Sequence, residues 1–169
     1  MNLKTTNFRL SVGRALHFYR RYSVADSDQS KASAAYYACY HAAIAAVELK
    51  ADFVLLKKAE NTSYHEALRN VYPRHYGAPT KKNKTKPQIV PHDVGSSLEI
   101  WHNLRIKADY FVFDEQFDEK DINKTRQRIG HMENFVKDHL QYFADNFPQL
   151  LTEGQAAEIG GILHPRSLS

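Results

Sequence analysis

The chain has 169 residues, a length that fits one domain with one hydrophobic core and leaves little room for a second. Apolar residues make up 43% of it and charged residues 25%, a globular composition that excludes an intrinsically disordered chain. The formal net charge of +4 favours anionic partners but is too small for a protein that coats DNA.

No apolar run approaches the roughly eighteen residues of a membrane-spanning helix. The first nine residues lack the apolar core of a signal peptide, so we expect a cytoplasmic protein with no membrane association. The single cysteine, Cys39, excludes an internal disulfide and a cysteine-rich zinc site and is typical of a reducing compartment. Because Cys39 lies in an apolar stretch, we expect a buried, unreactive thiol.

The N-terminal third of the chain predicts two long helices. Residues 3–22 have the spacing of an amphipathic helix. The sequence Ser27-Asp28-Gln29-Ser30 then offers good N-cap side chains before an alanine-rich run over residues 31–51. This second helix is apolar nearly all round, which is typical of a helix at the centre of a fold or shared with a partner.

A short third helix is predicted over residues 62–72 and is expected to end at Pro73. The segment that follows is rich in lysine, and we interpret it as a mobile basic loop. Its lysines suit the phosphate backbone of RNA and a preceding tyrosine could stack on a base, although a solvated loop explains the same residues equally well. The residues assigned to this RNA-binding segment are Lys81, Lys82, Lys84, Lys86 and Tyr76.

Two further helices are predicted, over residues 94–111 and 119–146, each with an apolar stripe at helical spacing. Beyond Pro148 the pattern weakens, so residues 148–169 are expected to form a partly ordered C-terminal tail. No alternating pattern of convincing length predicts a strand. The predicted fold class is therefore all-α, an antiparallel bundle of four to five helices over residues 1–147.

Two stretches of the sequence resemble the HEPN family. One is ASAAYYACYHAA on the second predicted helix, residues 32–43, and the other is LRIKADY at the end of the fourth, residues 104–110. A YYA-x-x-HAA helix followed by R-x-x-ADY is similar to the small stand-alone prokaryotic branch of that family. The resemblance extends over about residues 3–147, with only these two stretches specific.

The resemblance implies a HEPN-like helical bundle, usually a homodimer, and an association with RNA. Family members include metal-independent ribonuclease toxins, proteins that sit beside a nucleotidyltransferase-like or other cognate partner in toxin–antitoxin pairs, and modules of phage-defence systems. The catalytic members share an arginine, commonly followed by a polar residue, and a histidine four to six positions later at a dimer cleft. They cut RNA with its own 2′-hydroxyl and need no metal.

This arginine–histidine motif is absent where the resemblance would place it, because residues 106–113 after Arg105 contain no histidine. Arg69, which a polar residue follows, and His75 have the required spacing elsewhere in the chain. Chance accounts for such a pair among ten arginines and nine histidines. Since Pro73 between them is expected to break the helix, Arg69 and His75 are the weaker catalytic candidates.

His102, Arg105 and Asp109 are spaced to line one edge of the fourth predicted helix. Arg105 would bind a phosphate, Asp109 would orient its guanidinium, and His102 would act as an acid or base. The alternative is an Arg105–Asp109 ion pair that fixes packing beside a solvated histidine. His41, with Tyr37 one turn before it, is a further catalytic candidate if a cleft opens between the second and fourth helices; otherwise it is a buried structural histidine.

Glu99 and His102 form a Glu-x-x-His pair of the kind that binds iron in helical bundles, but no second pair accompanies them. We therefore expect no metal and no cofactor. Three functions remain open. The first is a HEPN-like module that binds RNA or a protein partner, the second is a metal-independent ribonuclease using Arg105 or Arg69 with His75, and the third is a purely structural, oligomerising bundle.

Overall fold

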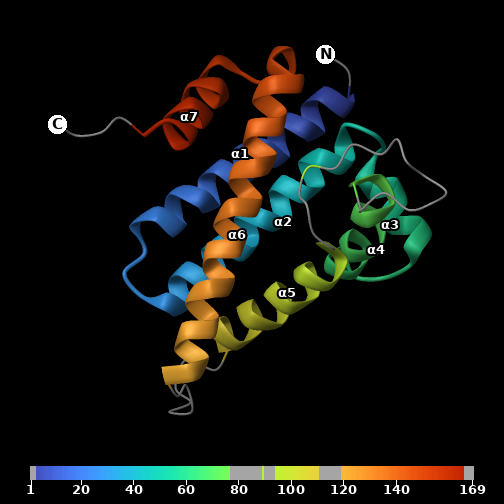
Figure 1. Ribbon diagram of the computed structural model, residues 1–169. Helices are drawn as coiled ribbons and strands as arrows, with labels where there is room; N and C mark the ends of the chain where they lie inside the picture. The colour runs from blue at the N-terminus through green and yellow to red at the C-terminus, as the bar shows by residue number, and fades with distance from the viewer. Residues whose placement is uncertain (1–2, 77–88, 90–93, 111–118, 166–169) are drawn as a thin grey trace.

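The computed structural model describes residues 3–76, 89, 94–110 and 119–165. Within these ranges it contains helices and no strand, which confirms the predicted all-α class (Figure 1). The elements are α1 (Leu3–Val24), α2 (Asp28–Glu48), α3 (Phe53–Glu60), α4 (Tyr64–Tyr76), α5 (Val94–Tyr110), α6 (Glu119–Asn146), the short 3-10 helix η1 (Pro148–Leu150) and α7 (Glu153–Leu163).

Helices α1 and α2 form an antiparallel hairpin, and the turn between them uses the predicted cap. The Ser27 hydroxyl accepts a hydrogen bond from the Ser30 backbone N–H, which satisfies one of the free donors at the start of α2. Helix α2 then runs through the middle of the molecule, with α1, α4, α5 and α6 packed around it (Figure 1). Its apolar character on all sides therefore reflects a central position within one chain.

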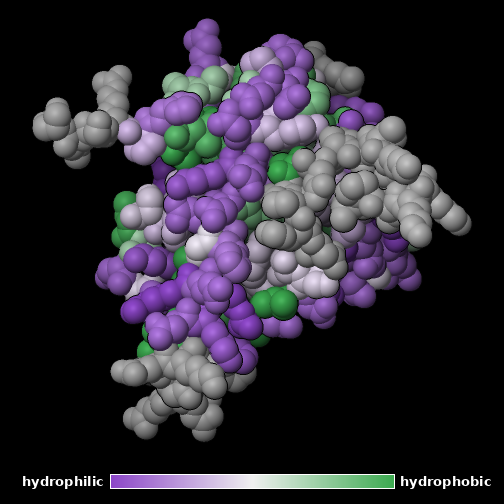
Figure 2. Space-filling view, viewed as in Figure 1, coloured by the Kyte–Doolittle hydropathy of each residue, from purple (hydrophilic) through white to green (hydrophobic). Residues whose placement is uncertain are grey.

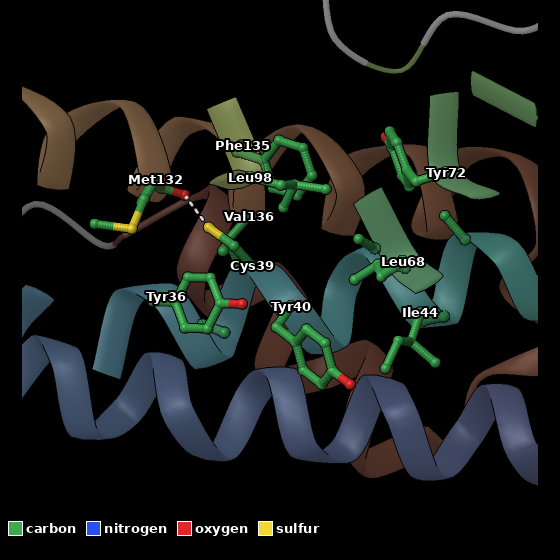
Figure 3. Close-up of a cluster of buried hydrophobic side chains, with 14 of the residues drawn as sticks. Tyr36, Cys39, Tyr40, Ile44, Leu68, Tyr72, Leu98, Met132, Phe135 and Val136 are labelled. Atoms are coloured by element: carbon green, nitrogen blue, oxygen red, sulfur yellow. Dashed lines mark hydrogen bonds between the residues drawn. The ribbon is translucent and has the colours of Figure 1, made fainter. Parts of the chain in front are cut away.

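Small side chains allow this close packing around α2. The helix carries eight alanines, all of them buried, so neighbouring backbones approach it closely. Cys39 is completely buried between α2 and α6, and its Sγ lies 3.1 Å from the Met132 carbonyl oxygen (Figure 3). The predicted burial of Cys39 is confirmed, and burial raises the pKa of its thiol well above the usual value.

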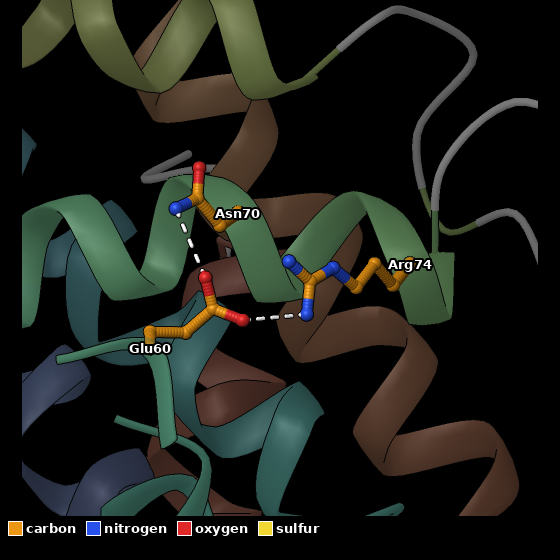
Figure 4. A network of polar contacts seen from close by, with 3 residues as sticks. All are labelled: Glu60, Asn70 and Arg74. Atoms are coloured by element: carbon orange, nitrogen blue, oxygen red, sulfur yellow. Dashed lines mark hydrogen bonds and ion pairs between the residues drawn. The ribbon is translucent and has the colours of Figure 1, made fainter. Parts of the chain in front are cut away.

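Helices α3 and α4 form a second hairpin, of which only α4 was predicted. Asp52 caps the start of α3, and Asn61 ends it in the left-handed conformation that asparagine tolerates. The Glu60 carboxylate then accepts hydrogen bonds from Asn70 and Arg74 and so fastens α3 to α4 (Figure 4).

The prediction that Pro73 ends this helix is wrong, since α4 continues to Tyr76. A proline inside a helix costs about 3 kcal/mol because it removes one backbone hydrogen bond. Two buried tyrosines on either side offset that cost. The Tyr72 hydroxyl lies 2.6 Å from His139 Nε2, and the Tyr76 hydroxyl donates to the Ala46 carbonyl at 2.6 Å, so both ends of this turn are anchored to the core.

Helices α5 and α6 agree with their predicted ranges to within one residue. Their apolar stripes are buried against α2, as the spacing predicted. Helix α5 lies beside α4 on one flank and diverges from α6 on the other (Figure 1). Helix α5 therefore separates two surfaces, one facing α4 and one facing α6.

The residues after Pro148 are more regular than the predicted partly ordered tail, because residues 148–150 and 153–163 are helical. Thr152 and Gln155 form a reciprocal capping box at the start of α7. Ile159 is buried, and the Gln155 side chain donates to the Arg9 carbonyl at 2.8 Å. These contacts hold α7 against α1 and α6 and away from α2, α4 and α5. No helix in the described ranges has the length and hydrophobicity needed to cross a membrane.

Candidate functional site

Three rings from three helices meet between α2, α4 and α5, and we call them the histidine cluster: Tyr36 from α2, His65 from α4 and His102 from α5. The Tyr36 hydroxyl lies 2.6 Å from His65 Nδ1, a hydrogen-bond distance. His65 and His102 stack with ring centroids 4.6 Å apart and an interplanar angle of 28°. The two histidines are half-buried, whereas Tyr36 is buried beneath them.

An aromatic layer continues the histidine cluster along α2 towards α1. The Tyr40 ring lies 4.6 Å from His65 and 5.2 Å from His41, measured between centroids. Phe18 of α1 stacks on both His41 and Tyr37. The His41 Nδ1 atom is buried without a hydrogen-bond partner in the described part of the chain. His41 therefore belongs to the apolar side of this layer.

Two arginines flank the histidine cluster, one from each of the helices that supply its histidines. On α5, Arg105 Nε lies 2.7 Å from Asp109 Oδ2, and the guanidinium carbon lies 5.1 Å from the centre of the Tyr37 ring. On α4, Arg69 Nη1 lies 3.2 Å from Glu99 Oε1. Both guanidinium groups are thus held in place by a carboxylate, and one also lies over an aromatic face.

The histidines of this region are kept neutral by their surroundings. Burial first, then the nearby His102, Arg105 and Arg69, lower the pKa of His65 to about 4. Burial and the same two arginines also lower the pKa of His102. For His41, burial followed by Arg14 and His65 lowers the pKa to about 4. The cations that disfavour protonated histidine here would favour a bound anion for the same electrostatic reason.

The arrangement combines groups with three chemical capacities. Neutral imidazoles can accept a proton, arginines can bind a phosphate oxygen, and the planes of the half-buried imidazoles and of Arg105 can stack on a base. His65 Nδ1 is engaged by Tyr36, so its Nε2 is the nitrogen left for proton exchange with a ligand. Neither ring nitrogen of His102 has a hydrogen-bond partner among the contacts that the described residues make.

The fold brings together the main residues that the sequence singled out. His102 and Arg105 lie at the α4 flank of α5, and the anticipated intrahelical ion pair between Arg105 and Asp109 is present. His41 reaches this group only through the aromatic layer, since Phe18 stacks on both its ring and that of Tyr37. The geometry therefore links His41 and Arg105 indirectly.

Arg69 and His75, the weaker pair of catalytic candidates, lie on the same helix but point in different directions. Six residues along an α-helix correspond to more than one and a half turns, so the two side chains leave α4 on different flanks. Arg69 is placed instead near His65 and His102, whose pKa values it lowers. Arg69 thus belongs to the site, but without its predicted histidine.

One assignment to the RNA-binding segment is wrong. Tyr76 is completely buried and bonded to the Ala46 carbonyl, so its ring is not available to stack on a base. Its apolar ring provides more stability inside the core than on a polar surface. The four lysines of that segment, Lys81, Lys82, Lys84 and Lys86, lie outside the described residues.

Sequence reasoning missed His65, the histidine at the centre of the site. It lies on α4, far in sequence from both resembling stretches, and the predicted arginine–histidine pair on that helix does not include it. A weak signal existed, because His65 and Arg69 are four residues apart and hence on one helix face. Only the packing of α4 against α2 and α5 shows which neighbours that face meets.

Within the ranges that the structure describes, no group of three or more histidine, cysteine, aspartate and glutamate side chains is arranged to hold a metal ion. Comparisons with protein-family models, with curated proteins and with solved structures found no match to this chain. The HEPN resemblance therefore rests on its two sequence stretches.

Proposed function

We propose that this protein is a HEPN-like, RNA-associated module that binds an RNA phosphate at the histidine cluster. The observation that carries the proposal is the convergence of His65, His102, Arg69 and Arg105 from α4 and α5 over the tyrosines of α2. Burial first, and then the two arginines, keep both histidines neutral, because the guanidinium groups repel an imidazolium. A phosphate would relieve this repulsion.

The planar groups of the site favour a nucleic-acid phosphate over a free one. The Arg105 guanidinium lies over the Tyr37 ring, and a base could stack on the planar guanidinium beside the phosphate contact. Because Arg105 and Arg69 are each held by a carboxylate, their guanidinium groups are positioned before the ligand arrives. The site thus combines an oriented cation with an aromatic surface.

Metal-independent cleavage of RNA is a second candidate, and the stacking of His65 on His102 favours it. A bound phosphate would favour protonation of one imidazole, and repulsion between two adjacent imidazolium groups would keep the other neutral, which gives one acid and one base. The base would take the proton of the 2′-hydroxyl as its oxygen bonds to phosphorus. The acid would give a proton to the 5′-oxygen as the bond between that oxygen and phosphorus breaks, and the products are a cyclic phosphate and a free hydroxyl.

One experiment tests both candidates. Labelled single-stranded RNA is incubated with the protein in EDTA, and binding and cleavage are measured for wild type, His65→Gln, His102→Gln and Arg105→Gln. His164→Gln, an exposed histidine at the end of α7, is the matched control. Circular dichroism and thermal melts show that each variant is folded.

We expect weaker RNA binding in the three cluster variants, by about tenfold for Arg105→Gln because it loses a charge-assisted phosphate contact. The control should bind like wild type. Cleavage in EDTA that both His65→Gln and His102→Gln abolish would establish the second candidate. Equal RNA binding by every folded variant, or no binding by wild type, would contradict the proposal. The partner, homodimer, toxin–antitoxin and phage-defence roles stay predictions from the resemblance.

A further inference from the structure

The opposite flank of α5 carries a second polar surface. Residues 100, 103 and 107 lie on the side of this helix facing away from His102, Arg105 and Asp109, as the 3.6-residue period requires. Together with residues 124, 125 and 128 of α6 they line a hollow of about 220 Å³, which we call the basic groove. It is therefore separate from the histidine cluster, although both use α5.

Three cations border the basic groove: Lys107 from α5, and Lys124 and Arg128 from α6. All three are exposed, and no ion pair or cation–π contact involves them in the part of the chain that the structure describes. Arg126, between the two α6 cations in sequence, points elsewhere and binds Asp28 at 2.9 Å. The described lining of the groove includes no carboxylate.

Repulsion among these three cations destabilises the protein when no ligand is bound. Lys124 and Arg128 are four residues apart on α6, so two like charges occupy neighbouring positions of one helix face. Lys107 adds a third from across the groove. An anion in the groove would replace these repulsions with attractions, whereas the described fold provides nothing that does so.

The rest of the lining suits a sugar–phosphate chain. Ile100 is 44% exposed, a large apolar side chain at the groove surface, and it could pack against a ribose. Asn103 adds an exposed neutral side chain that can hydrogen-bond a phosphate oxygen. Arg128 offers the planar fork that matches two oxygens of one phosphate. Figure 2, with α6 towards the viewer, shows polar side chains predominating on this face.

We infer that the basic groove binds the backbone of single-stranded RNA, as a contact surface separate from the histidine cluster. The choice of RNA as the polyanion rests on the function proposed above. The groove itself is argued from its own charges and shape. In this arrangement the groove supplies sequence-independent affinity, while the histidine cluster acts on one phosphate.

The test compares two triple variants of the full chain. In the groove variant, Lys107→Gln, Lys124→Gln and Arg128→Gln remove three charges. In the control, Lys50→Gln, Lys57→Gln and Lys58→Gln remove three charges at the end of α2 and in α3, away from α5 and α6 (Figure 1). Binding of a labelled single-stranded RNA is measured across a range of salt concentrations, in parallel with a labelled polyglutamate peptide.

We expect the slope of log affinity against log salt to fall by about 2 in the groove variant, since each phosphate contact with a single strand contributes roughly 0.7. The control should keep the wild-type slope. Equal slopes in the groove variant and wild type would overturn the inference and leave the histidine cluster proposal standing. If wild type binds polyglutamate but no RNA, and the groove variant binds neither, the groove is a site for an acidic protein and the RNA inference fails. Binding of neither probe by wild type also overturns it.

Discussion

Two histidine–tyrosine pairs with the same hydrogen-bond distance lie in contrasting surroundings. Tyr36 and His65 are joined at 2.6 Å at a half-exposed surface, and Tyr72 and His139 are joined at 2.6 Å in the core. His139 is completely buried, and its Nδ1 lies 2.7 Å from the Phe135 carbonyl oxygen. A carbonyl can only accept, so Nδ1 carries the proton and Nε2 accepts from Tyr72. Both ring nitrogens of His139 are therefore engaged within the protein.

The two pairs differ in whether a histidine nitrogen remains without a partner and in the charges beside it. Both histidines have a pKa lowered to about 4, by burial and, for His65, by nearby cations as well. His65 uses one nitrogen and has His102 and two arginines beside it, whereas His139 is surrounded by aromatic rings. A lowered histidine pKa thus does not by itself identify a functional site. The remaining nitrogen and the neighbouring charges make that distinction.

The largest contrast is expected on truncation of the histidines. His139→Ala should lower the free energy of unfolding by about 3–5 kcal/mol, because it opens a cavity and leaves the buried Tyr72 hydroxyl without its partner. His65→Ala should cost about 1 kcal/mol, since water can replace its contacts. Urea unfolding of both variants measures this, and similar losses would mean that His65 is also a structural residue.

The low pKa of the buried histidine also predicts a loss of stability in acid. A histidine whose folded pKa is below its unfolded value of about 6.5 opposes folding once the unfolded state takes up a proton. For His139, stability is therefore complete above pH 6.5 and falls by up to about 3 kcal/mol as the pH drops towards 4. His139→Gln should flatten this part of the curve of unfolding free energy against pH. A curve parallel to that of wild type would show that His139 is not responsible.

Removing one hydroxyl from each pair gives a smaller, matched comparison. Tyr72→Phe should cost about 1–3 kcal/mol, because His139 Nε2 then lies buried without a donor. Tyr36→Phe should cost less than about 1 kcal/mol, since the half-exposed His65 can bond to water instead. Thermal or urea unfolding checks the pair. A larger loss for Tyr36→Phe would reverse the roles assigned here.

The smallest effect is a change of protonation on ligand binding. A phosphate at the histidine cluster should raise the pKa of His65 and His102, because a negative charge favours imidazolium, and should leave the pKa of His139 unchanged. NMR titration of the histidine ring protons with and without a short RNA measures all three. A shift at His139 alone, or at none, would remove the support for a phosphate site.

The fold was largely predictable because local sequence patterns, such as apolar spacing and capping residues, mark most of its helices. The bounds of α6 follow from its apolar spacing, and the start of α2 from Ser27. Helix α4 passes Pro73 because tertiary contacts of two tyrosines exceed a local penalty, and no local pattern reports such contacts. Helix α7 carries a local signal of its own, the T-x-x-Q capping box beginning at Thr152.

The candidate site was only half predictable for the same reason. His102, Arg105 and Asp109 share one helix edge, so helical periodicity was sufficient to group them. His65 enters from α4, and His139 has an equally low pKa without belonging to the site. Pairing across helices depends on which faces meet, and that is decided by packing over the whole core.

The eight buried alanines of α2 also determine how this protein can vary. A larger side chain at such a position forces neighbouring backbones apart at a cost of about 1–3 kcal/mol. The only smaller residue, glycine, costs about 1 kcal/mol in helix propensity. Almost every substitution of a buried alanine in α2 therefore lowers the stability of the fold. Divergence among descendants of this chain should accumulate in the surrounding helices, with α2 as the segment by which distant members can still be recognised.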